Sequence, residues 1–371
     1  MRILILCHEY PPVGGGAASV SLTLAETYAG RGHQVVAVTM GWDDLPGSSI
    51  SGSGVELRRI ACGRRRREEA GSASALAWAA LALRWCRREH VRRPFDVVHA
   101  HFVMPAGIVA ERLRARGVPF VLTAHGTDVP GFDPRRFRRA HRLVRGWWRR
   151  IYERAAFRVA PSGALEELLR AAAPSLATTR VPNPVGGSSS PGVPKEPLIL
   201  LCGRLVERKG FGDFFRALRG VDLPGWGLEV VGDGPQRPLL EALAGELRAP
   251  VRFHGWLDRT QPLLHQLFAR SAIFAFPSLR ENLPVVLLEA MAAKCAIVAT
   301  DLPGNVEALG SCARLVRAGN AEQMREAVVE LVSQPERRRL LGDEARRRAE
   351  SEFGEEVVTQ RYLALLEAAR R

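Results

Sequence analysis

Residues 273–290, which read IFAFPSLRENLPVVLLEA, decide the fold. The stretch opens with an apolar run, residues 273–276, that has the length of a buried β-strand. A loop that contains Pro277 and several polar residues follows, and the apolar residues after it suit a helix. Strand, loop and helix in immediate succession form the repeating unit of a parallel sheet that is covered by helices.

The same alternation runs through the whole chain. In the first half, strands are expected at residues 2–7, 34–39, 55–60, 96–100, 120–123, 157–160 and 179–182. In the second half they are expected at residues 198–202, 228–231, 251–254, 273–276, 297–300 and 313–316. Most of these runs are apolar on both faces, which is typical of parallel strands under helices. The fold class is therefore α/β, with two doubly wound Rossmann-like domains that face a cleft.

Chain length and a linker also indicate two domains. A chain of 371 residues exceeds the roughly 250 to 300 residues at which one hydrophobic core stops growing. Residues 182–194 are rich in Pro, Gly and Ser, so they sustain neither a helix nor a strand. We expect an N-terminal domain over residues 1–185, a linker over 186–196 and a C-terminal domain over 197–352. A final helix over 353–371 is expected to pack back toward the N-terminal domain.

Positive charge is concentrated in the first half of the chain. The formal net charge is +14, and residues 1–183 hold 28 arginines against 15 acidic residues. A basic half of this kind favours anionic partners, such as phosphorylated substrates, acidic lipid headgroups or nucleic acid. The alternative interpretation is a general preference for arginine, because the chain has only three lysines.

The six cysteines are scattered, and no two have the C-x-x-C spacing of a zinc site or a redox pair. We therefore expect neither a zinc site nor a redox pair among them, and a reducing, cytoplasmic compartment. The apolar run at residues 3–7 is too short for a signal peptide or a membrane span.

Two carboxylates distinguish the stretch from 273 to 290. Glu281 and Glu289 are eight residues apart, so we expect Glu281 at the mouth of a helix and Glu289 on the same side within it. A buried carboxylate is costly without partners, and the two hydroxyls of a ribose would supply them for Glu289. A salt bridge within the protein is the alternative. Asn282 and Leu283 would offer backbone N–H groups to an anionic group at the helix N-terminus.

Two cations follow the strand at 198–202. Arg204 and Lys209 flank a turn that lies between this strand and a predicted helix. Arg204 can form paired hydrogen bonds with phosphate oxygens, and Lys209 can act as a point charge. The pair therefore suits a diphosphate.

A glycine run follows the first strand. Gly14, Gly15 and Gly16 allow the backbone to approach a phosphate or a sugar closely at the start of a helix. The run is not the dinucleotide-binding fingerprint, because Ser19 stands where the third glycine belongs.

A second polar loop follows the strand at 120–123. His125 can donate a hydrogen bond to a sugar hydroxyl, and Asp128 can accept one from an acceptor hydroxyl. The alternative is a loop that its own Asp and Thr side chains stabilise.

These motifs together resemble the family-4 retaining glycosyltransferases of the GT-B fold, over nearly the whole chain. The matching segments are residues 14–16, 97–101, 123–128, 181–183, 203–205, 209–210, 231–235, 253–255, 281–289 and 299–301. Position 282 is Asn and position 284 is Pro, where glycine or another small residue is frequent in this family. Both differences lie beside the expected sugar site, so the resemblance does not specify the donor sugar.

The resemblance implies a nucleotide-diphosphate sugar as donor and a role for each matching residue. Arg204 and Lys209 would hold the diphosphate and stabilise the leaving group, while Glu289 would bind the ribose. Glu281 and the backbone at 282–283 would face the donor sugar, and His125 would contact it. The glycines at 14–16 would approach the phosphates from the N-terminal domain. The reaction would retain the anomeric configuration and would need no metal and no other cofactor.

Residues 135–158 interleave arginines with Trp147, Trp148 and Tyr152. This pattern fits a helix on an anionic membrane surface. We expect peripheral docking on the inner face of the membrane and a lipid-linked or other cell-envelope saccharide as acceptor. The alternative is a solvated helix whose tryptophans pack into the first domain.

Two other functions stay open from the sequence. A nucleotide-sugar epimerase with the GT-B shape would act on the donor alone, so it would form product without an acceptor. A non-catalytic basic binding protein would rest on charge alone, and the chain has no recognisable nucleic-acid-binding motif.

Overall fold

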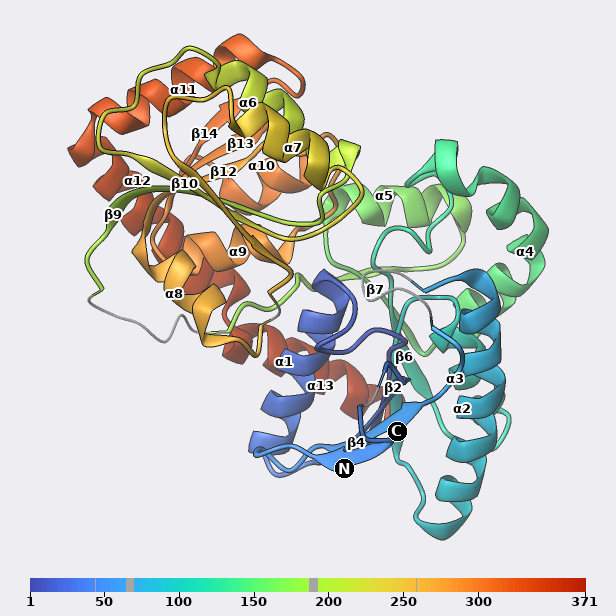
Figure 1. Ribbon diagram of the computed structural model, residues 1–371. Coiled ribbons are helices and arrows are strands. Elements are labelled where there is room, and N and C mark those ends of the chain that lie inside the picture. The colour runs from blue at the N-terminus through green and yellow to red at the C-terminus, as the bar shows by residue number, and fades with distance from the viewer. Residues whose placement is uncertain (44, 65–69, 187–192, 258) are drawn as a thin grey trace. The chain divides into compact units, whose positions relative to one another are not determined.

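The computed structural model describes the chain except for residues 44, 65–69, 187–192 and 258, and for residues 134–140 it describes the backbone only. The middle of the predicted linker, residues 187–192, therefore lies outside the described residues. The chain forms two compact units (Figure 1). One consists of Met1–Pro184 together with Glu355–Arg371, and the other is Val185–Gly354.

The N-terminal unit is built on an eight-stranded sheet with the order β3-β4-β2-β1-β5-β6-β7-β8. The strands are β1 (Arg2–Leu6), β2 (Gln34–Met40), β3 (Ser48–Ile50), β4 (Glu56–Ile60), β5 (Val97–His101), β6 (Phe120–Thr123), β7 (Phe157–Ala160) and β8 (Thr179–Arg180). All neighbours pair in parallel except β3, which runs antiparallel to β4. The sequence does not predict β3, because only one of its three side chains is apolar. β8 ends before the expected residue 182, which is a proline and cannot donate to a ladder.

Helices cover both faces of this sheet. They are α1 (Gly16–Gly30), α2 (Ser72–Arg92), α3 (Ala106–Arg114), α4 (Pro134–Arg154), α5 (Gly163–Ala172) and α13 (Glu355–Arg370). Helices α1 and α13 lie on one face, whereas α2 and α3 lie on the other (Figure 1). Tyr362 of α13 is fully buried, and Oγ1 of Thr123 on β6 donates a hydrogen bond to its hydroxyl at 3.2 Å. The last helix of the chain therefore belongs to the core of the N-terminal unit.

The C-terminal unit is built on a six-stranded parallel sheet with the order β11-β10-β9-β12-β13-β14. The strands are β9 (Glu196–Cys202), β10 (Gly227–Val231), β11 (Val251–Gly255), β12 (Ser271–Phe276), β13 (Ala296–Thr300) and β14 (Arg314–Val316). One face packs against α6 (Phe211–Leu218), α7 (Arg237–Ala244) and α11 (Ala321–Ser333). The other packs against α8 (Pro262–Arg270), α9 (Val285–Ala292), α10 (Pro303–Leu309) and α12 (Pro335–Arg348). The predicted fold class, with two doubly wound α/β sheets, is confirmed.

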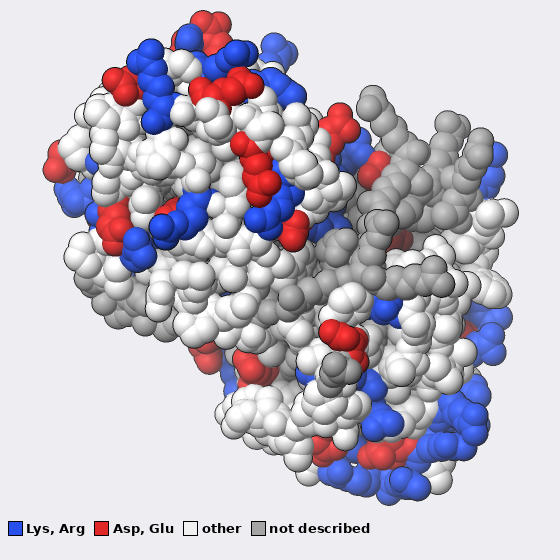
Figure 2. Space-filling view, in the orientation of Figure 1, with Lys and Arg blue, Asp and Glu red and all other residues white. Residues whose placement is uncertain are grey.

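Charge is distributed differently over the two units. Figure 2 shows blue and red side chains interspersed on the C-terminal unit, whereas blue side chains gather toward the lower end of the N-terminal unit, over α2. The exposed arginines of this region include Arg84, Arg88 and Arg92, which are spaced four residues apart on one face of α2. No helix in the described part of the chain is long and apolar enough to cross a membrane.

Candidate functional site

Each sheet has a point at which the order of its strands reverses direction. In the C-terminal unit the reversal lies between β9 and β12, and in the N-terminal unit it lies between β1 and β5. Ligands of doubly wound sheets bind beyond the carboxyl ends of the strands at such points. The loops that follow β9 and β12 carry Arg204, Lys209 and Glu281. Arg204, Lys209 and Glu281 therefore lie at the edge of the sheet where a ligand is expected.

Backbone contacts hold these two loops against each other. Gly210 has a φ of +68°, and a Cβ on it would lie 2.0 Å from the carbonyl oxygen of Pro277. The N–H of Leu279 also donates to the carbonyl oxygen of Arg208 at 2.8 Å. Only glycine fits at position 210, because both the conformation and the close approach exclude a side chain.

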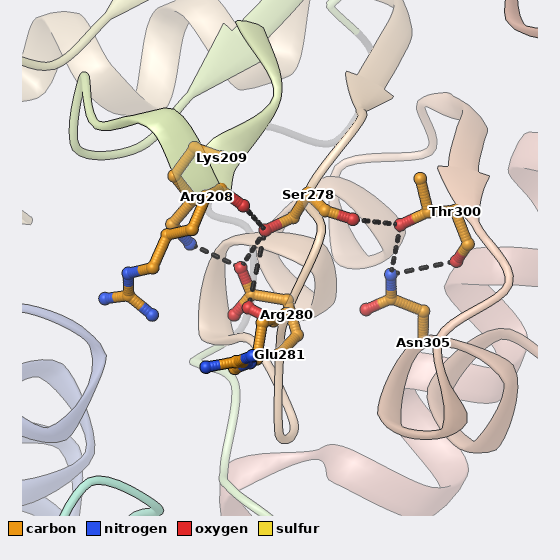
Figure 3. A network of polar contacts seen from close by, with 7 residues as sticks. All are labelled: Arg208, Lys209, Ser278, Arg280, Glu281, Thr300 and Asn305. Atoms are coloured by element: carbon orange, nitrogen blue, oxygen red, sulfur yellow. Dashed lines mark hydrogen bonds and ion pairs between the residues drawn. The ribbon is translucent and has the colours of Figure 1, made fainter. Parts of the chain in front are cut away.

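Lys209 and Glu281 form an ion pair across these loops. Nζ of Lys209 lies 2.6 Å from Oε1 of Glu281, and each side chain is 11% exposed. Figure 3 shows the two side chains pointing toward one another. Burial lowers the pKa of Lys209, and the Glu281 carboxylate opposes that shift. The Glu281 carboxylate therefore favours the positively charged form of Lys209.

A chain of hydrogen bonds leads away from Glu281 (Figure 3). Oγ of Ser278 donates to Oε1 of Glu281 at 2.5 Å, and Oγ1 of Thr300 donates to the carbonyl oxygen of Ser278 at 2.6 Å. Nδ2 of the fully buried Asn305 lies 3.2 Å from Oγ1 of Thr300 and 3.0 Å from its carbonyl oxygen. The loop with Lys209, the loop with Ser278 and the segment 300–305 thus hold the Glu281 carboxylate in place.

The expected placement of Glu281 at the mouth of a helix is wrong. Helix α9 begins at Val285, with Pro284 as its N-cap residue. A residue before proline is disfavoured in helical conformation, so Leu283 and Asn282 belong to the loop and not to the helix N-terminus. The carbonyl oxygen of Asn282 instead lies so close to Gly304 that a Cβ there would approach it to 1.3 Å.

Glu289 lies within α9, as expected, but its partner is different from that of Glu281. Nε of Arg259 lies 2.9 Å from Oε1 of Glu289, and each side chain is 13% exposed. Burial raises the pKa of Glu289, and the charge of Arg259 opposes the rise. The salt bridge that the sequence left as an alternative is present.

Arg204 lies in the glycine-rich loop after β9 and is partly exposed. Gly232, in the loop after β10, approaches this loop so closely that a Cβ would lie 1.9 Å from the carbonyl oxygen of Gly203. The N–H of Leu205 donates to the carbonyl oxygen of Asp233 at 2.9 Å. The backbone on both sides of Arg204 is therefore fixed by the neighbouring loop.

The glycine loop of the N-terminal unit contains its own acidic side chain. Gly14 has a φ of +96°, and the N–H of Gly15 donates to Oε2 of Glu9 at 3.2 Å. Helix α1 begins at Gly16. One of the backbone N–H groups expected to face an anion is thus bonded to Glu9.

Asp128 organises the loop that carries His125. Its Oδ1 accepts from the backbone N–H groups of His125 and Gly126, both at 3.0 Å, and its Oδ2 accepts from that of Val103 at 2.7 Å. The side chain is buried, and the carbonyl oxygen of Asp128 accepts from Nε1 of Trp148 on α4 at 2.8 Å. These bonds match the alternative in which the loop stabilises itself, and they leave acceptor binding by Asp128 as a prediction.

Sequence reasoning missed Ser278, Thr300, Asn305 and Arg259. Ser278 and Thr300 carry a usable signal, since each lies at the carboxyl end of a predicted strand. Asn305 and Arg259 carry none, because their partners are set by packing between distant segments. Within the described ranges, no group of three or more His, Cys, Asp or Glu side chains is arranged to hold a metal ion.

Two family models match this chain. Residues 14–186 match the one described as glycosyltransferase family 4, and residues 196–334 match the one described as glycosyl transferases group 1. A 2-deoxystreptamine N-acetyl-D-glucosaminyltransferase of Streptomyces fradiae is 29% identical over 365 residues, which cover 89% of this chain and 85% of that protein. A phosphatidyl-myo-inositol mannosyltransferase of Mycobacterium leprae is 30% identical over 351 residues, 90% of this chain and 87% of that one.

The fold has close counterparts among solved structures. The crystal structure of an Anabaena protein in complex with UDP-glucose superposes with a TM-score of 0.77 at 19% identity. The match covers 99% of this chain and all of that one. At this identity the likeness concerns the fold.

Proposed function

This chain belongs to the family-4 glycosyltransferases of the GT-B fold, and we propose that it transfers a sugar from a nucleotide-diphosphate sugar to a lipid-linked or other cell-envelope saccharide. We propose further that the transfer retains the anomeric configuration and needs no metal ion. The observation that carries the proposal is the largely buried Lys209–Glu281 pair near Arg204, at the strand-order reversal of the C-terminal unit.

Arg204 and Lys209 bind the donor diphosphate in this proposal. The planar guanidinium of Arg204 can donate two parallel hydrogen bonds to phosphate oxygens, and the ammonium of Lys209 adds a fixed positive charge. Negative charge develops on the diphosphate as the bond to the sugar breaks. Cations that are already held in place stabilise that charge without reorganising, which is the role that a metal ion fills in other enzymes.

Glu289 binds the ribose of the nucleotide. Its side chain is only 13% exposed, and one carboxylate oxygen contacts Arg259, so the carboxylate can accept from ribose hydroxyls through its remaining lone pairs. When the ribose binds, Glu289 either keeps its contact with Arg259 or replaces it with hydrogen bonds from the ribose hydroxyls. In either case the buried carboxylate keeps partners when the donor is bound.

Helix α4 provides the acceptor side in this proposal. Leu143 is 87% exposed and Trp147, four residues later on the same face, is 61% exposed. Arg142 and Arg145 of the same helix are also exposed, whereas Trp148 is buried. An exposed apolar pair on a helix that also exposes arginines suits an anionic lipid surface. One relative is named for a phosphatidyl-inositol acceptor, which favours lipid; the other is named for 2-deoxystreptamine.

A thermal-shift panel of nucleoside diphosphates and nucleotide sugars tests the donor site. A ligand that binds the folded protein raises its melting temperature by mass action. We expect one nucleotide base to stabilise the wild type but neither Arg204→Ala nor Glu289→Ala. Arg325→Ala, which removes an exposed arginine of α11, is the matched control and should respond like the wild type. A panel in which every nucleotide fails to stabilise the wild type, or stabilises all four proteins alike, contradicts the proposed donor site.

A further inference from the structure

His101 and His125 meet at the carboxyl ends of adjacent strands of the N-terminal unit. His101 is the last residue of β5, and His125 lies two residues beyond the end of β6. Nδ1 of His101 lies 3.0 Å from Nε2 of His125. His101 is fully buried, whereas His125 is partly exposed. The exposed ring is therefore held by a second, inaccessible imidazole.

Burial favours the neutral form of both rings. Burial lowers the pKa of His125 to about 3 and that of His101 well below its ordinary value, and neighbouring His8 and His99 add to these shifts. A hydrogen bond between two neutral imidazoles needs an N–H on one ring and a lone pair on the other. Two arrangements are thus available. In one of them Nδ1 of His125 carries an N–H and is a donor, and in the other it carries a lone pair and is an acceptor.

The second nitrogen of His101 decides between them. Within the described residues, Nε2 of His101 is buried and has no hydrogen-bond partner. If His125 were the donor, His101 would carry its proton on Nε2, which leaves a buried N–H without an acceptor. If His101 donates from Nδ1, Nε2 keeps only a lone pair. Buried N–H groups without partners are rare in proteins, so the second arrangement is favoured.

The neighbouring His99 is fixed in the opposite tautomer. Thr123 donates its hydroxyl proton to Tyr362, so Oγ1 of Thr123 must accept from Nε2 of His99 at 2.9 Å. Nδ1 of His99 then accepts from the hydroxyl of Tyr28 at 3.2 Å. Both ring nitrogens of His99 therefore have hydrogen-bond partners, so His99 does not need a hydrogen bond with His125.

The ring and backbone of His125 are held from other sides as well. Phe102 has a φ of +76°, a conformation that is strained for an aromatic residue, and its ring centroid lies 4.7 Å from that of His125. Asp128 fixes the backbone N–H of His125. A ring held at its backbone, its face and one nitrogen can present its other nitrogen in one direction.

We propose that His101 is a positioning residue that holds His125 with its proton on Nδ1, so that His125 offers an N–H donor to a substrate oxygen and does not act as a base. The identity of that oxygen, on a donor sugar, rests on the proposed function. A hydrogen-bond donor at this position suits a transfer in which the leaving diphosphate needs stabilisation more than the acceptor needs deprotonation.

The tautomer can be measured without any substrate. Long-range ¹H–¹⁵N spectra of histidine-labelled protein distinguish a protonated from an unprotonated ring nitrogen. At pH 7.5 we expect His125 and His101 to be protonated on Nδ1 and His99 on Nε2. Protonation of His125 on Nε2 in the wild type overturns the proposal, whatever the enzyme's substrates prove to be.

Three variants test whether His101 is the cause. In His101→Leu the bond is lost, so we expect His125 to move toward the Nε2-protonated form. In His101→Asn an amide N–H takes the place of Nδ1, so we expect His125 to keep its tautomer. Tyr28→Phe removes a hydrogen bond of His99 in the same core and should leave His125 unchanged. An unchanged His125 signal in His101→Leu overturns the proposal. If His101→Leu does not fold, loss of the Nδ1-protonated form in folded His101→Asn overturns it instead.

Kinetics supply a second readout once a donor is known. His101→Leu should lower kcat by about tenfold or more, as loss of a residue that orients an active group does, with little change in the KM for donor. His101→Asn should recover most of that loss. An equal loss in both variants, or a change confined to KM, contradicts positioning of His125. Absence of any transfer activity in the wild type would refute the proposed function and leave the tautomer measurement standing.

Discussion

Nζ of Lys209 lies 2.6 Å from Oε1 of Glu281, and this pair joins the loop after β9 to the loop after β12. Oγ of Ser278 donates to the same carboxylate oxygen, Oε1. Both of these contacts use the same oxygen of the Glu281 carboxylate. In the proposed function, the other oxygen, Oε2, would accept a hydrogen bond from a sugar hydroxyl.

Lys209→Met should damage both stability and activity. It leaves a buried carboxylate without its cation, which costs on the order of 3 kcal/mol in the free energy of unfolding. It also removes the positive charge that Lys209 is proposed to place beside the diphosphate, so the rate of transfer should fall by roughly a hundredfold or more. Chemical denaturation and initial rates measure the two effects. Lys209→Met combined with Glu281→Gln should recover stability but not rate, and recovery of both would show that Lys209 has only a structural role.

Thr300→Val should displace Glu281 without touching any ligand. It removes the hydroxyl that donates to the carbonyl oxygen of Ser278, so the loop that carries Glu281 loses one anchor. We expect about a tenfold loss of transfer rate, with Thr300→Ser restoring most of it because the hydroxyl returns. A double-mutant cycle with Ser278→Ala measures the coupling. Strictly additive losses would mean that Thr300 and Ser278 do not act on one network.

Gly304→Ala should destabilise the C-terminal unit. Its Cβ would lie 1.3 Å from the carbonyl oxygen of Asn282, so the loop or helix α10 must move, at a cost of about 1 to 3 kcal/mol. Gly71→Ala is the matched control, because its φ is −70° and nothing lies within 4 Å of its Cβ position. Melting temperatures measure both. Equal melting temperatures for the two variants would refute the close packing of Asn282 on Gly304.

Stability of the N-terminal unit should fall as the pH falls below 6.5. Burial lowers the pKa of His8 to about 4 and those of His99 and His125 to about 3, from an unfolded value of 6.5. The unfolded chain therefore binds more protons in this window, and the stability that these neutral rings contribute above pH 6.5 is lost on acidification. Each ring contributes a slope of up to about 1.4 kcal/mol per pH unit. Urea unfolding at pH 6.5, 5.5 and 4.5 measures this slope, and His99→Gln should reduce it. A free energy of unfolding that does not change over this pH range would contradict the neutral state of His8, His99 and His125.

Replacement of Leu143 and Trp147 by serine should abolish binding to anionic liposomes. These side chains are exposed on one face of α4, so their loss removes the apolar contact without disturbing the core. Flotation at low salt measures the binding. Leu76→Ser, which changes an exposed leucine on α2, is the control. If the wild type does not float with anionic vesicles, α4 is not a membrane surface.

The sequence predicted the strands and the loops well because both depend on local patterns. Buried parallel strands such as β1 and β13 are apolar at every position but one end residue, and glycines or prolines mark the ends of many elements. The loops that carry Arg204, Lys209, Glu281 and His125 follow directly, since the carboxyl ends of parallel strands meet at one edge.

The partners of these residues could not be predicted, because each is set by packing between distant segments. Lys209 meets Glu281 across 72 residues and Thr123 meets Tyr362 across 239. The eight-residue spacing of Glu281 and Glu289 suggested one helix face, but Pro284 delays the start of α9 and turns the two carboxylates to different partners. Spacing identifies which residues are polar in an apolar setting, and packing decides which groups they meet.

The measurement that tests the central claim most directly is product analysis with nucleotide sugars in the presence of EDTA. The donor chosen from the thermal-shift panel is incubated with a bacterial lipid extract, and the anomeric configuration of the product is read from NMR coupling constants. We predict that sugar is transferred to an acceptor with its configuration retained, that one nucleoside diphosphate is released for each sugar, and that Lys209→Met transfers sugar roughly a hundredfold more slowly. An altered sugar nucleotide formed without an acceptor, an inverted linkage or a strict requirement for metal would contradict the account.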